Sequence, residues 1–362
     1  MPTDPKKSID EYGPKMTKEN GLWNLINDLS NKKGITEIAF NSPRSIFVER
    51  EGQFIQLNVS VTKSEMYQFI KEVADFNQKI CDEHHPIMDG NLPDGSRVNI
   101  IVEPFSAGSP AITIRRYLKT FKSLDTAGKL FGLEAFWVQF LRAVVVSRAN
   151  IVVSGGTGSG KTTLMNMLLA EIPSTERLVT IEDTLELDIP QSNCIRLEAK
   201  TVIGGGEKST LTMRELIKNS LRMRPDRIII GEVRGGEFFD LMEAMNTGHD
   251  GSMCSIHANS PSECLNRMEN LYMMSDIELP MIVVKKQIAT AINFIVQIGR
   301  DRSGQRRVTS IAEITGIEGT NILMQHLAKY EDGVLVSTGI APKIMSNLNQ
   351  KGDLPLDFFS RQ

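Results

Sequence analysis

The sequence lacks any apolar run long enough to cross a membrane. Its apolar runs, such as Ala143–Val146 and Ile228–Ile230, fall far below the roughly 18 residues that a membrane-spanning helix needs. The first 20 residues are polar and hold three prolines, so they do not have the charged and then apolar form of a signal peptide. We therefore expect a cytoplasmic protein that is at most peripheral to a membrane.

Cysteine is scarce, and its spacing is not that of a zinc site. The chain has 4 cysteines, and none of them forms a C-x-x-C pair. We expect reduced, structural thiols of the kind found in the cytosol. These cysteines are Cys81, Cys194, Cys254 and Cys264.

An excess of positive charge is also missing. The formal net charge is -3 at pH 7, whereas a protein whose main task is to grip a nucleic-acid backbone is usually basic. Hydrophobic residues make up 41% and charged residues 23% of the chain, which is the balance of a globular protein with a real core and argues against disorder. A length of 362 residues suits two domains.

Shifts in composition along the chain predict four segments. They are a flexible tail at 1–17, an N-terminal domain of mixed α and β structure at 18–118, a polar linker at 119–129 and a second domain with a C-terminal extension at 130–362.

In the N-terminal domain we expect short strands and one well-marked helix. Thr62 and Glu65 have the spacing of a capping box, and apolar residues follow at helical intervals. Strands are predicted at 35–40, 45–49, 54–57, 96–103 and 111–116.

The second domain alternates apolar strands with amphipathic helices. A helix is predicted at about 133–146, and another follows Lys161. Strands that alternate with helices in this way form a parallel sheet covered on both faces, so the fold class is α/β. The predicted strands lie at 150–154, 178–181, 227–231 and 252–256.

A glycine-rich segment between a predicted strand and a predicted helix has the form of a phosphate loop. Residues 155–162 read GGTGSGKT, which fits G-x-x-x-x-G-K-[ST]. Glycines let the backbone fold into a nest of inward N–H groups, and the helix N-terminus adds partial positive charge. We expect Lys161 to reach the β- and γ-phosphates and the Thr162 hydroxyl to ligate Mg²⁺, so that the chain binds and hydrolyses Mg·ATP.

The predicted nucleotide-binding residues are Gly155, Gly156, Thr157, Gly158, Ser159, Gly160, Lys161, Thr162 and Thr163.

Hydrolysis also needs groups that orient water and hold the metal. Glu232 comes directly after an apolar strand, which is where ligands lie in open α/β sheets, and Gly231 stands before it where an aspartate is common. Glu182, Asp183 and Glu186 follow another apolar strand. Acids that gather in this way indicate a nearby cation or water, although a solvated acidic loop has the same pattern.

Two histidines flank the strand predicted at 252–256. His249 precedes it and His257 follows it. A lone histidine is more often a polar filler than a catalyst, but a place at a strand end also suits a group that senses phosphate or orients a side chain. The residues by themselves leave both interpretations open.

Four motifs follow one another in an order typical of one family. Together they resemble the secretion-system and type IV pilus traffic ATPases, which carry a Walker A loop, an Asp box, an atypical Walker B motif with Gly before Glu, and a His box. The resemblance covers about residues 18–328. The four motifs lie at 155–162, 182–186, 224–234 and 248–260.

Further motifs are similar to those of the CpaF/TadA branch, which powers tight-adherence (Tad) pili. They are ITEI at 35–38, DGSRVNI at 94–100, MNTGHDGS at 245–252 and EITGIEG at 313–319.

The resemblance implies a homohexameric ring. Each subunit would have an N-terminal α+β domain followed by a RecA-like P-loop NTPase domain, with ATP and Mg²⁺ between the two. The ring would drive Tad or type IV pilus assembly, or type II/IV secretion, through an inner-membrane platform protein. It would be a peripheral protein at the cytoplasmic face of that membrane, held there through its partners, and no stable binding to nucleic acid is expected.

The resemblance also assigns roles to residues of the second domain. By motif position, Glu186 would polarise the attacking water, and Glu232 would act near Mg²⁺ through water. His257 and His249 would couple the γ-phosphate to neighbouring elements.

In the N-terminal domain the resemblance singles out Arg97 and Arg115. They correspond to arginines that reach the phosphates, where a guanidinium stabilises the transition-state charge and reports nucleotide state to the ring. From the sequence alone, solvated strand arginines would be the better interpretation.

Three other functions stay open. A DNA or RNA translocase on the same core is the main alternative, but the net negative charge opposes it. A basic cluster near residue 300 is interrupted by aspartate and polar residues and has no aromatic neighbours to stack bases, so we expect a solvated hairpin face there. The others are a nucleotide-gated scaffold with little turnover and a small-molecule phosphotransferase. The cluster consists of Arg300, Arg302, Arg306 and Arg307.

Overall fold

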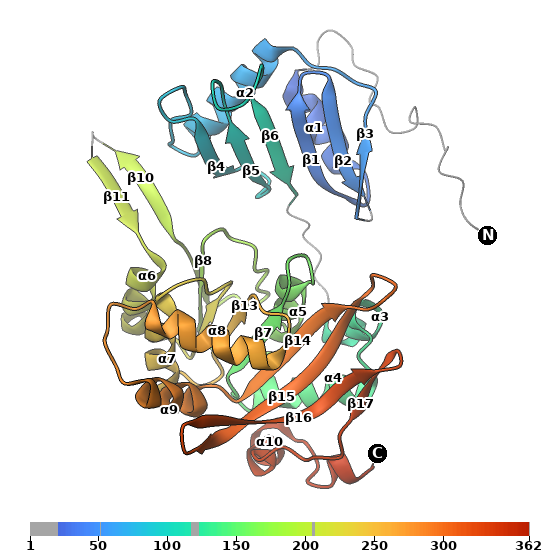
Figure 1. Ribbon diagram of the computed structural model, residues 1–362, viewed down its shortest axis with the longest axis vertical. Coiled ribbons are helices and arrows are strands. Elements are labelled where there is room, and N and C mark those ends of the chain that lie inside the picture. Colours follow the sequence, from blue (N-terminus) through green and yellow to red (C-terminus); the bar gives the residue numbers. More distant parts are fainter. Residues whose placement is uncertain (1–20, 51, 117–122, 205–206, 362) are drawn as a thin grey trace, which may run out of the picture. The chain divides into compact units, whose positions relative to one another are not determined.

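The computed structural model describes residues 21–50, 52–116, 123–204 and 207–361 (Figure 1). The chain divides after residue 119 into two compact units, and the segment 201–209 groups with the first of them. The tail predicted at 1–17 lies outside the described residues. None of the helices in the described ranges is long and apolar enough to span a bilayer.

The first unit is built on an antiparallel sheet with the strand order β3-β2-β1-β6-β5-β4. One face of α1 (Leu22–Asn31) and of α2 (Lys63–Phe76) is buried in the same core as alternate strand residues. The strands are β1 (Ile35–Ser42), β2 (Ser45–Arg50), β3 (Gln53–Gln56), β4 (Ile87–Asn91), β5 (Arg97–Ile101) and β6 (Ala111–Arg115).

The capping box predicted at the start of α2 is confirmed. Thr62 Oγ1 accepts a hydrogen bond from the Glu65 N–H at 3.1 Å, and the Glu65 carboxylate accepts one from the Thr62 N–H at 2.7 Å. The five predicted strands of this unit are confirmed with small shifts of their ends. β4 was not predicted, because its Asp-Gly-Asn sequence is typical of a turn and only its pairing with β5 makes it a strand.

The second unit contains a sheet with the order β17-β16-β15-β14-β7-β13-β12-β8-β9. The strands from β14 to β9 run parallel, and β14 to β17 form an antiparallel meander. The four predicted parallel strands are confirmed as β7 (Ile151–Gly155), β8 (Leu178–Glu182), β12 (Arg227–Ile230) and β13 (Met253–Ile256). The other strands of this sheet are β9 (Cys194–Glu198), β14 (Phe294–Arg300), β15 (Arg306–Glu318), β16 (Asn321–Glu331) and β17 (Val334–Ser337). β10 (Lys200–Gly204) and β11 (Glu207–Leu211) pair with each other in a separate hairpin, which contains the segment 201–209.

Helices cover both faces of this sheet, as the alternation of strands and helices predicted. Ile151 and Val153 are buried in one core, whereas Val152 between them is buried in the other. The first core contains residues of α3 (Ala127–Phe131), α4 (Ala135–Val146), α5 (Lys161–Leu169) and α10 (Met345–Gly352). The second contains residues of α6 (Met213–Ser220), α7 (Glu237–Asn246), α8 (Pro261–Met273) and α9 (Met281–Ala291).

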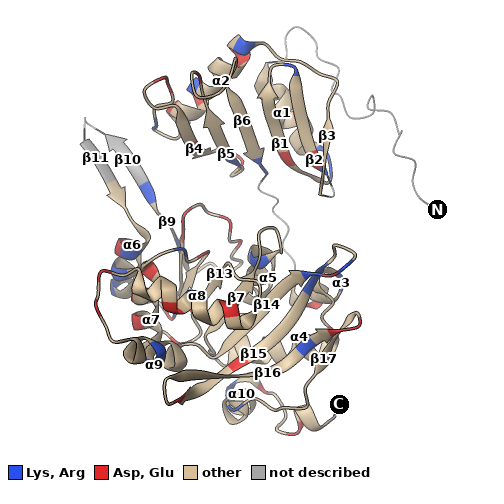
Figure 2. Ribbon diagram, viewed as in Figure 1, with Lys and Arg blue, Asp and Glu red and all other residues tan. Residues whose placement is uncertain are grey.

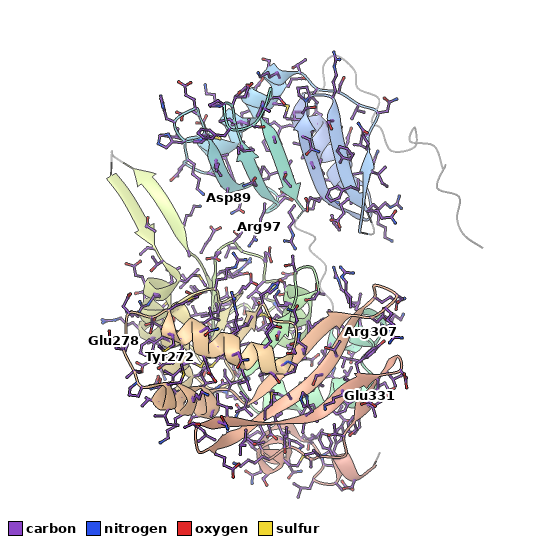
Figure 3. All side chains as sticks on the ribbon, viewed as in Figure 1. Asp89, Arg97, Tyr272, Glu278, Arg307 and Glu331 are labelled. Carbon is purple, nitrogen blue, oxygen red and sulfur yellow. The ribbon has the colours of Figure 1, made fainter. Side chains whose placement is uncertain are left out.

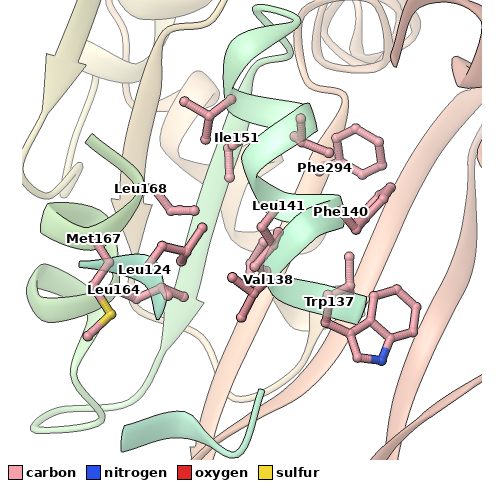
Figure 4. Close-up of a cluster of buried hydrophobic side chains, with 14 of the residues drawn as sticks. Leu124, Trp137, Val138, Phe140, Leu141, Ile151, Leu164, Met167, Leu168 and Phe294 are labelled. Carbon is pink, nitrogen blue, oxygen red and sulfur yellow. The ribbon is translucent and has the colours of Figure 1, made fainter. Parts of the chain in front are cut away.

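The linker predicted at 119–129 is wrong for its described part. Residues 124–126 form a 3₁₀ helix, and α3 begins directly after them. Leu124 and Ala127 are fully buried in the first core, where Leu124 lies among the side chains of α4 and α5 (Figure 4). These two apolar residues are isolated among polar neighbours, so no periodic pattern revealed them.

Candidate nucleotide-binding site

The loop at 155–162 connects the end of β7 to the start of α5, and its glycines are required by its geometry. Gly158 and Gly160 have φ values of +66° and +102°, which L side chains rarely adopt. A Cβ on Gly155 would lie 2.5 Å from Ser159 Oγ and 2.9 Å from the Ile298 carbonyl oxygen. The loop therefore has the tight turn, with glycines at its crowded positions, that a phosphate nest needs.

The remaining polar residues of the loop differ in exposure. Ser159 is buried, and its hydroxyl donates to the Gly156 carbonyl at 2.8 Å. Thr157 is exposed near the tip of the loop, and Thr163 is half-buried in the first turn of α5. Ser159 thus stabilises the loop, while Thr157 is open to a ligand.

The ammonium group of Lys161 is held inside the loop. It donates to the carbonyl oxygens of Gly155 and Gly156 at 3.0 and 3.2 Å, and it lies 3.7 Å from Glu232 Oε1. These contacts fix a positive charge at the place where the β- and γ-phosphates of a nucleotide would meet it.

Thr162 and Glu186 meet although they come from different motifs. The Thr162 hydroxyl donates to Glu186 Oε2 at 3.3 Å. The contact forms because β7 and β8 are parallel strands of one sheet and end at the same edge. The structure therefore brings the predicted Mg²⁺ ligand next to the residue predicted to polarise water.

Glu182 is buried and binds the backbone of its own loop. It is 2% exposed, and its Oε1 accepts hydrogen bonds from the N–H groups of Glu186 and Leu187, both at 2.8 Å. Burial raises the pKa of Glu182, and these two hydrogen bonds and the charge of Arg196 offset only part of that rise. Glu182 thus holds the segment that carries Glu186, a role that the sequence did not indicate.

Glu182 also explains the unusual glycine before Glu232. A Cβ on Gly231 would lie 3.0 Å from Glu182 Cγ and 3.3 Å from Glu182 Oε1. A side chain at Gly231 would therefore displace the carboxylate that holds the Glu186 segment.

Glu232 lies just past the end of β12, between two cations. Its Oε2 accepts a hydrogen bond from Arg234 Nε at 2.9 Å, and its Oε1 faces Lys161 at 3.7 Å. Burial raises the pKa of Glu232, but the hydrogen bond and charge of Arg234, together with the charges of Lys161 and His257, outweigh burial and hold that pKa below its ordinary value. Glu232 is therefore an anion at neutral pH.

Arg234 was not predicted as a site residue. Besides binding Glu232, its guanidinium lies 3.5 Å from Asp183 Oδ2. The hydrogen bond to Glu232 and, less strongly, the charges of Asp183 and Glu186 raise the pKa of Arg234. One arginine thus links the carboxylates of two motifs. The only sequence signal for it is its position two residues after Glu232.

Asn259 is a second residue that was not predicted. Its Oδ1 would lie 3.7 Å from a Cβ on Gly156, and its backbone N–H donates to Glu263 Oε2 at 3.0 Å. The end of the His box therefore lies beside the phosphate loop.

The two predicted histidines lie at opposite edges of the parallel sheet. His257 follows β13 at the edge of the sheet where the phosphate loop lies, and it is one of the groups that lower the pKa of Glu232. His249 precedes β13, and its Nδ1 lies 3.1 Å from the carbonyl oxygen of Ala244 in the last turn of α7. Within this chain His249 therefore lies away from the phosphate loop, because parallel strands place the two ends of β13 at different edges. Its coupling of the γ-phosphate to neighbouring elements stays a prediction.

Arg97 and Arg115 belong to the first unit, where they form a cross-strand pair. They lie directly opposite each other on β5 and β6, and Arg115 also lies opposite Glu37 on β1 (Figure 3 labels Arg97). Opposed residues on antiparallel strands share one face, so the two side chains leave the sheet on the same side. Their action on a phosphate stays a prediction.

The oxygen donors beside the loop suit a hydrated Mg²⁺. They are the Thr162 hydroxyl and the carboxylates of Glu186 and Glu232. Within the described ranges, no group of three or more His, Cys, Asp and Glu side chains could enclose a metal ion. Mg²⁺ commonly binds one or two protein oxygens and completes its shell with phosphates and waters, so these residues fit it.

A family model described as "Type II/IV secretion system protein" matches residues 19–326. The chain belongs to this family. Its members include secretion ATPases, and membership implies that the chain binds a nucleotide.

Named relatives in this family are similar over most of their length. "Conjugal transfer protein TrbB" of Rhizobium radiobacter is 35% identical over 302 residues, which cover 82% of this chain and 89% of TrbB. "Type IV secretion system protein PtlH" of Bordetella pertussis is 34% identical over 309 residues, which cover 77% of this chain and 90% of PtlH. The named relatives are thus proteins of conjugal transfer and type IV secretion, and the nucleic-acid translocase is not favoured for this chain.

The fold of the family is found in a solved structure as well. The ATPase DotB of Legionella pneumophila has a TM-score of 0.59 and 18% identity, with 83% of this chain and 82% of DotB covered. The predicted fold class, an N-terminal α+β domain followed by a RecA-like P-loop NTPase domain, is confirmed.

Proposed function

We propose that this chain is a motor that hydrolyses Mg·ATP to drive pilus assembly or secretion. The observation that carries this proposal is the contact of Thr162 with Glu186 beside the ammonium group of Lys161. A cradle alone would only bind a nucleotide, whereas a carboxylate at that position can also orient a water for attack. Membership of the secretion family supports the same reading.

In this proposal, different residues bind the phosphates, orient the attacking water and hold the metal. Lys161 and the N–H groups of the loop bind the β- and γ-phosphates, and Glu186 Oε2 accepts a hydrogen bond from the attacking water. Thr162 Oγ1 and, through water, Glu232 would hold Mg²⁺, which when bound neutralises charge on the phosphates. Glu182 keeps the backbone of Glu186 in place.

We also propose the finer assignment to the CpaF/TadA branch and thus to Tad pili. The motifs at 35–38, 94–100 and 245–252 support it. In this proposal the chain forms a homohexamer at the cytoplasmic face of the inner membrane and moves a platform protein. Arg97 and Arg115 would contribute positive charge to the phosphates.

The first test is the Mg-dependent ATPase activity of the wild type beside Lys161→Ala and Glu186→Gln. Each variant should lower kcat on the order of 10² or more, and Glu186→Gln should still bind ATP. Glu278→Gln is the matched control, because Glu278 is an exposed glutamate outside the site.

Inactivity of the wild type, even when it is concentrated enough to assemble, would favour the nucleotide-gated scaffold instead. The ring has its own test, light scattering during size exclusion with and without nucleotide. A monomer at micromolar concentration under both conditions would contradict the hexamer.

A further inference from the structure

The hairpin of β14 and β15 lies beside the phosphate loop. β14 is parallel to β7, and Ile298 pairs with Gly155, the first residue of the loop. Arg300 therefore emerges at the same edge of the sheet as the loop. Figure 2 shows basic residues gathered where β14 and β15 meet.

Arg300 joins the turn of this hairpin to the tip of the loop. Its Nη2 donates to the Gly158 carbonyl oxygen at 3.1 Å, and its Nη1 donates to the Gly304 carbonyl oxygen at 2.8 Å. One guanidinium thus fixes the carbonyl group of a glycine whose φ is +66°.

The turn that carries Arg300 is itself well held. Asp301 Oδ1 accepts hydrogen bonds from the N–H groups of Ser303 and Gln305 at 2.9 and 3.0 Å. Asp301 Oδ2 accepts one from Arg307 Nε at 3.1 Å. These bonds present Arg300 to the loop from a fixed position, and they occupy Arg307 within the hairpin.

The hairpin touches the loop at a second glycine. A Cβ on Gly160 would lie 3.3 Å from Arg306 Cδ, and Arg306 is half-buried. Arg300 is exposed, as expected of a solvated hairpin face, but its guanidinium also contacts the phosphate loop. The sequence could not show this contact, because Arg300 and Gly158 are 142 residues apart.

We propose that Arg300 is a positioning residue for the nucleotide. Glycines leave the free loop many backbone conformations, and binding a nucleotide must select one of them. By holding the Gly158 carbonyl, Arg300 would keep the loop in its binding conformation and so increase nucleotide affinity. It would leave the chemical step unchanged, because Glu186 and Thr162 lie at the other end of the loop. This inference rests on the proposed function, since it requires that the loop binds a nucleotide.

The same turn offers a matched control. Arg302 is exposed, and it has no hydrogen-bond or ion-pair partner in the part of the chain that the structure describes. Arg302→Ala removes the same charge as Arg300→Ala from the same turn, but it removes no contact with the loop.

The test compares wild type, Arg300→Ala, Arg300→Lys and Arg302→Ala by titration with a fluorescent ADP analogue and by KM and kcat for ATP. Arg300→Ala should weaken ADP binding and raise KM by about tenfold, the effect of one lost charge-assisted hydrogen bond, with kcat within about twofold of wild type. Arg302→Ala should bind as wild type does. Arg300→Lys should restore part of the affinity, because a lysine reaches one carbonyl but not two.

Wild-type affinity in Arg300→Ala would overturn the proposal, and so would an equal loss in Arg302→Ala, which would mean a general effect of charge. A lower kcat at unchanged affinity would also overturn it. A melting temperature of Arg300→Ala below that of wild type, measured without nucleotide, would also overturn it, because Arg300 would then stabilise the fold as a whole. Failure of the wild type to bind ADP would instead refute the proposed function, and this binding does not depend on turnover or on a ring.

Discussion

Two glutamates of the site are placed in opposite electrostatic environments. Burial raises the pKa of Glu182, whereas the cations around Glu232 hold its pKa below the ordinary value. Such divergence of neighbouring carboxylates is typical of functional sites. It separates a buried group that holds the backbone from an ionised group that can face a hydrated cation.

The role of Glu182 predicts a loss of turnover without a loss of binding. Glu182→Ala should lower kcat on the order of tenfold to a hundredfold, because the Glu186 segment loses two hydrogen bonds to an acidic group. The affinity for ADP should stay within about twofold, since the hydrogen bonds of Glu182 go to Glu186 and Leu187, outside the phosphate loop. Steady-state kinetics and ADP titration measure the two quantities, with Glu278→Gln as the control.

Gly231 gives a second prediction at this scale. Gly231→Ala should lower the free energy of unfolding by about 1–3 kcal/mol, because the new Cβ crowds Glu182. Urea denaturation measures this, and Gly21→Ala is the control because a Cβ there meets nothing within 4 Å. In a double-mutant cycle with Glu182→Ala, the losses of unfolding free energy of the two single variants should be less than additive. Full additivity would show that Gly231 does not act through Glu182.

The raised pKa of Glu182 also predicts a pH dependence of stability. The folded protein binds the proton of Glu182 more tightly than the unfolded chain does. The contribution of Glu182 to stability is therefore complete below about pH 4.5, the ordinary pKa of a glutamate. It is lost as pH rises through the higher pKa of the folded state. The free energy of unfolding of wild type relative to Glu182→Gln should therefore fall across that window. Urea denaturation at a series of pH values measures it, and a difference that rises with pH would contradict the assignment.

At the scale of elements, the direction of β13 decides which histidine can act. The strand runs parallel to β7, so only the residue after its end reaches the edge of the phosphate loop. His257→Gln should lower kcat by about tenfold, the loss of one positioned polar group near the phosphates. His249→Gln should leave kcat within about twofold and cost about 1 kcal/mol of stability through the lost contact with α7. Equal losses of kcat in the two variants would show that His249 acts in another way.

The element scale also shows how a hairpin becomes part of a site. β14 lies next to β7 in the sheet, although the two strands are far apart in the sequence. Their adjacency places the hairpin turn beside the phosphate loop, so that Arg300 contacts the loop whereas Arg302 in the same turn is only exposed to solvent. Composition and local pattern could not distinguish these two roles.

At the scale of the whole molecule, the proposed motor needs the first unit as well as the second. Arg115→Ala should lower kcat on the order of 10² or more if its guanidinium stabilises the transition state. Glu37→Gln is the matched control, because Glu37 lies opposite Arg115 on β1 and is not expected to meet the nucleotide. Unchanged kcat in Arg115→Ala, measured on assembled protein, would remove this arginine from the proposed mechanism.

The sequence by itself determined the features that depend on neighbours along the chain. The phosphate loop could be predicted because a nest needs glycines and a lysine at fixed spacing. The capping box at Thr62 could be predicted because its hydrogen bonds close within one helical turn. The alternation of strands and helices predicted the parallel sheet for the same reason. The carboxylates of Glu186 and Glu232 could be placed near the loop because parallel strands end at one edge.

Only the tertiary structure decided the features that depend on distant partners. It buried Leu124, placed Glu182 on the backbone beside Gly231, turned His249 to the far edge and brought Arg300 to Gly158. In each case the side chain is ordinary in its local sequence, and its role comes from an element that strand order and strand direction bring alongside it. Such contacts are set by the packing of the whole sheet, which no local pattern encodes.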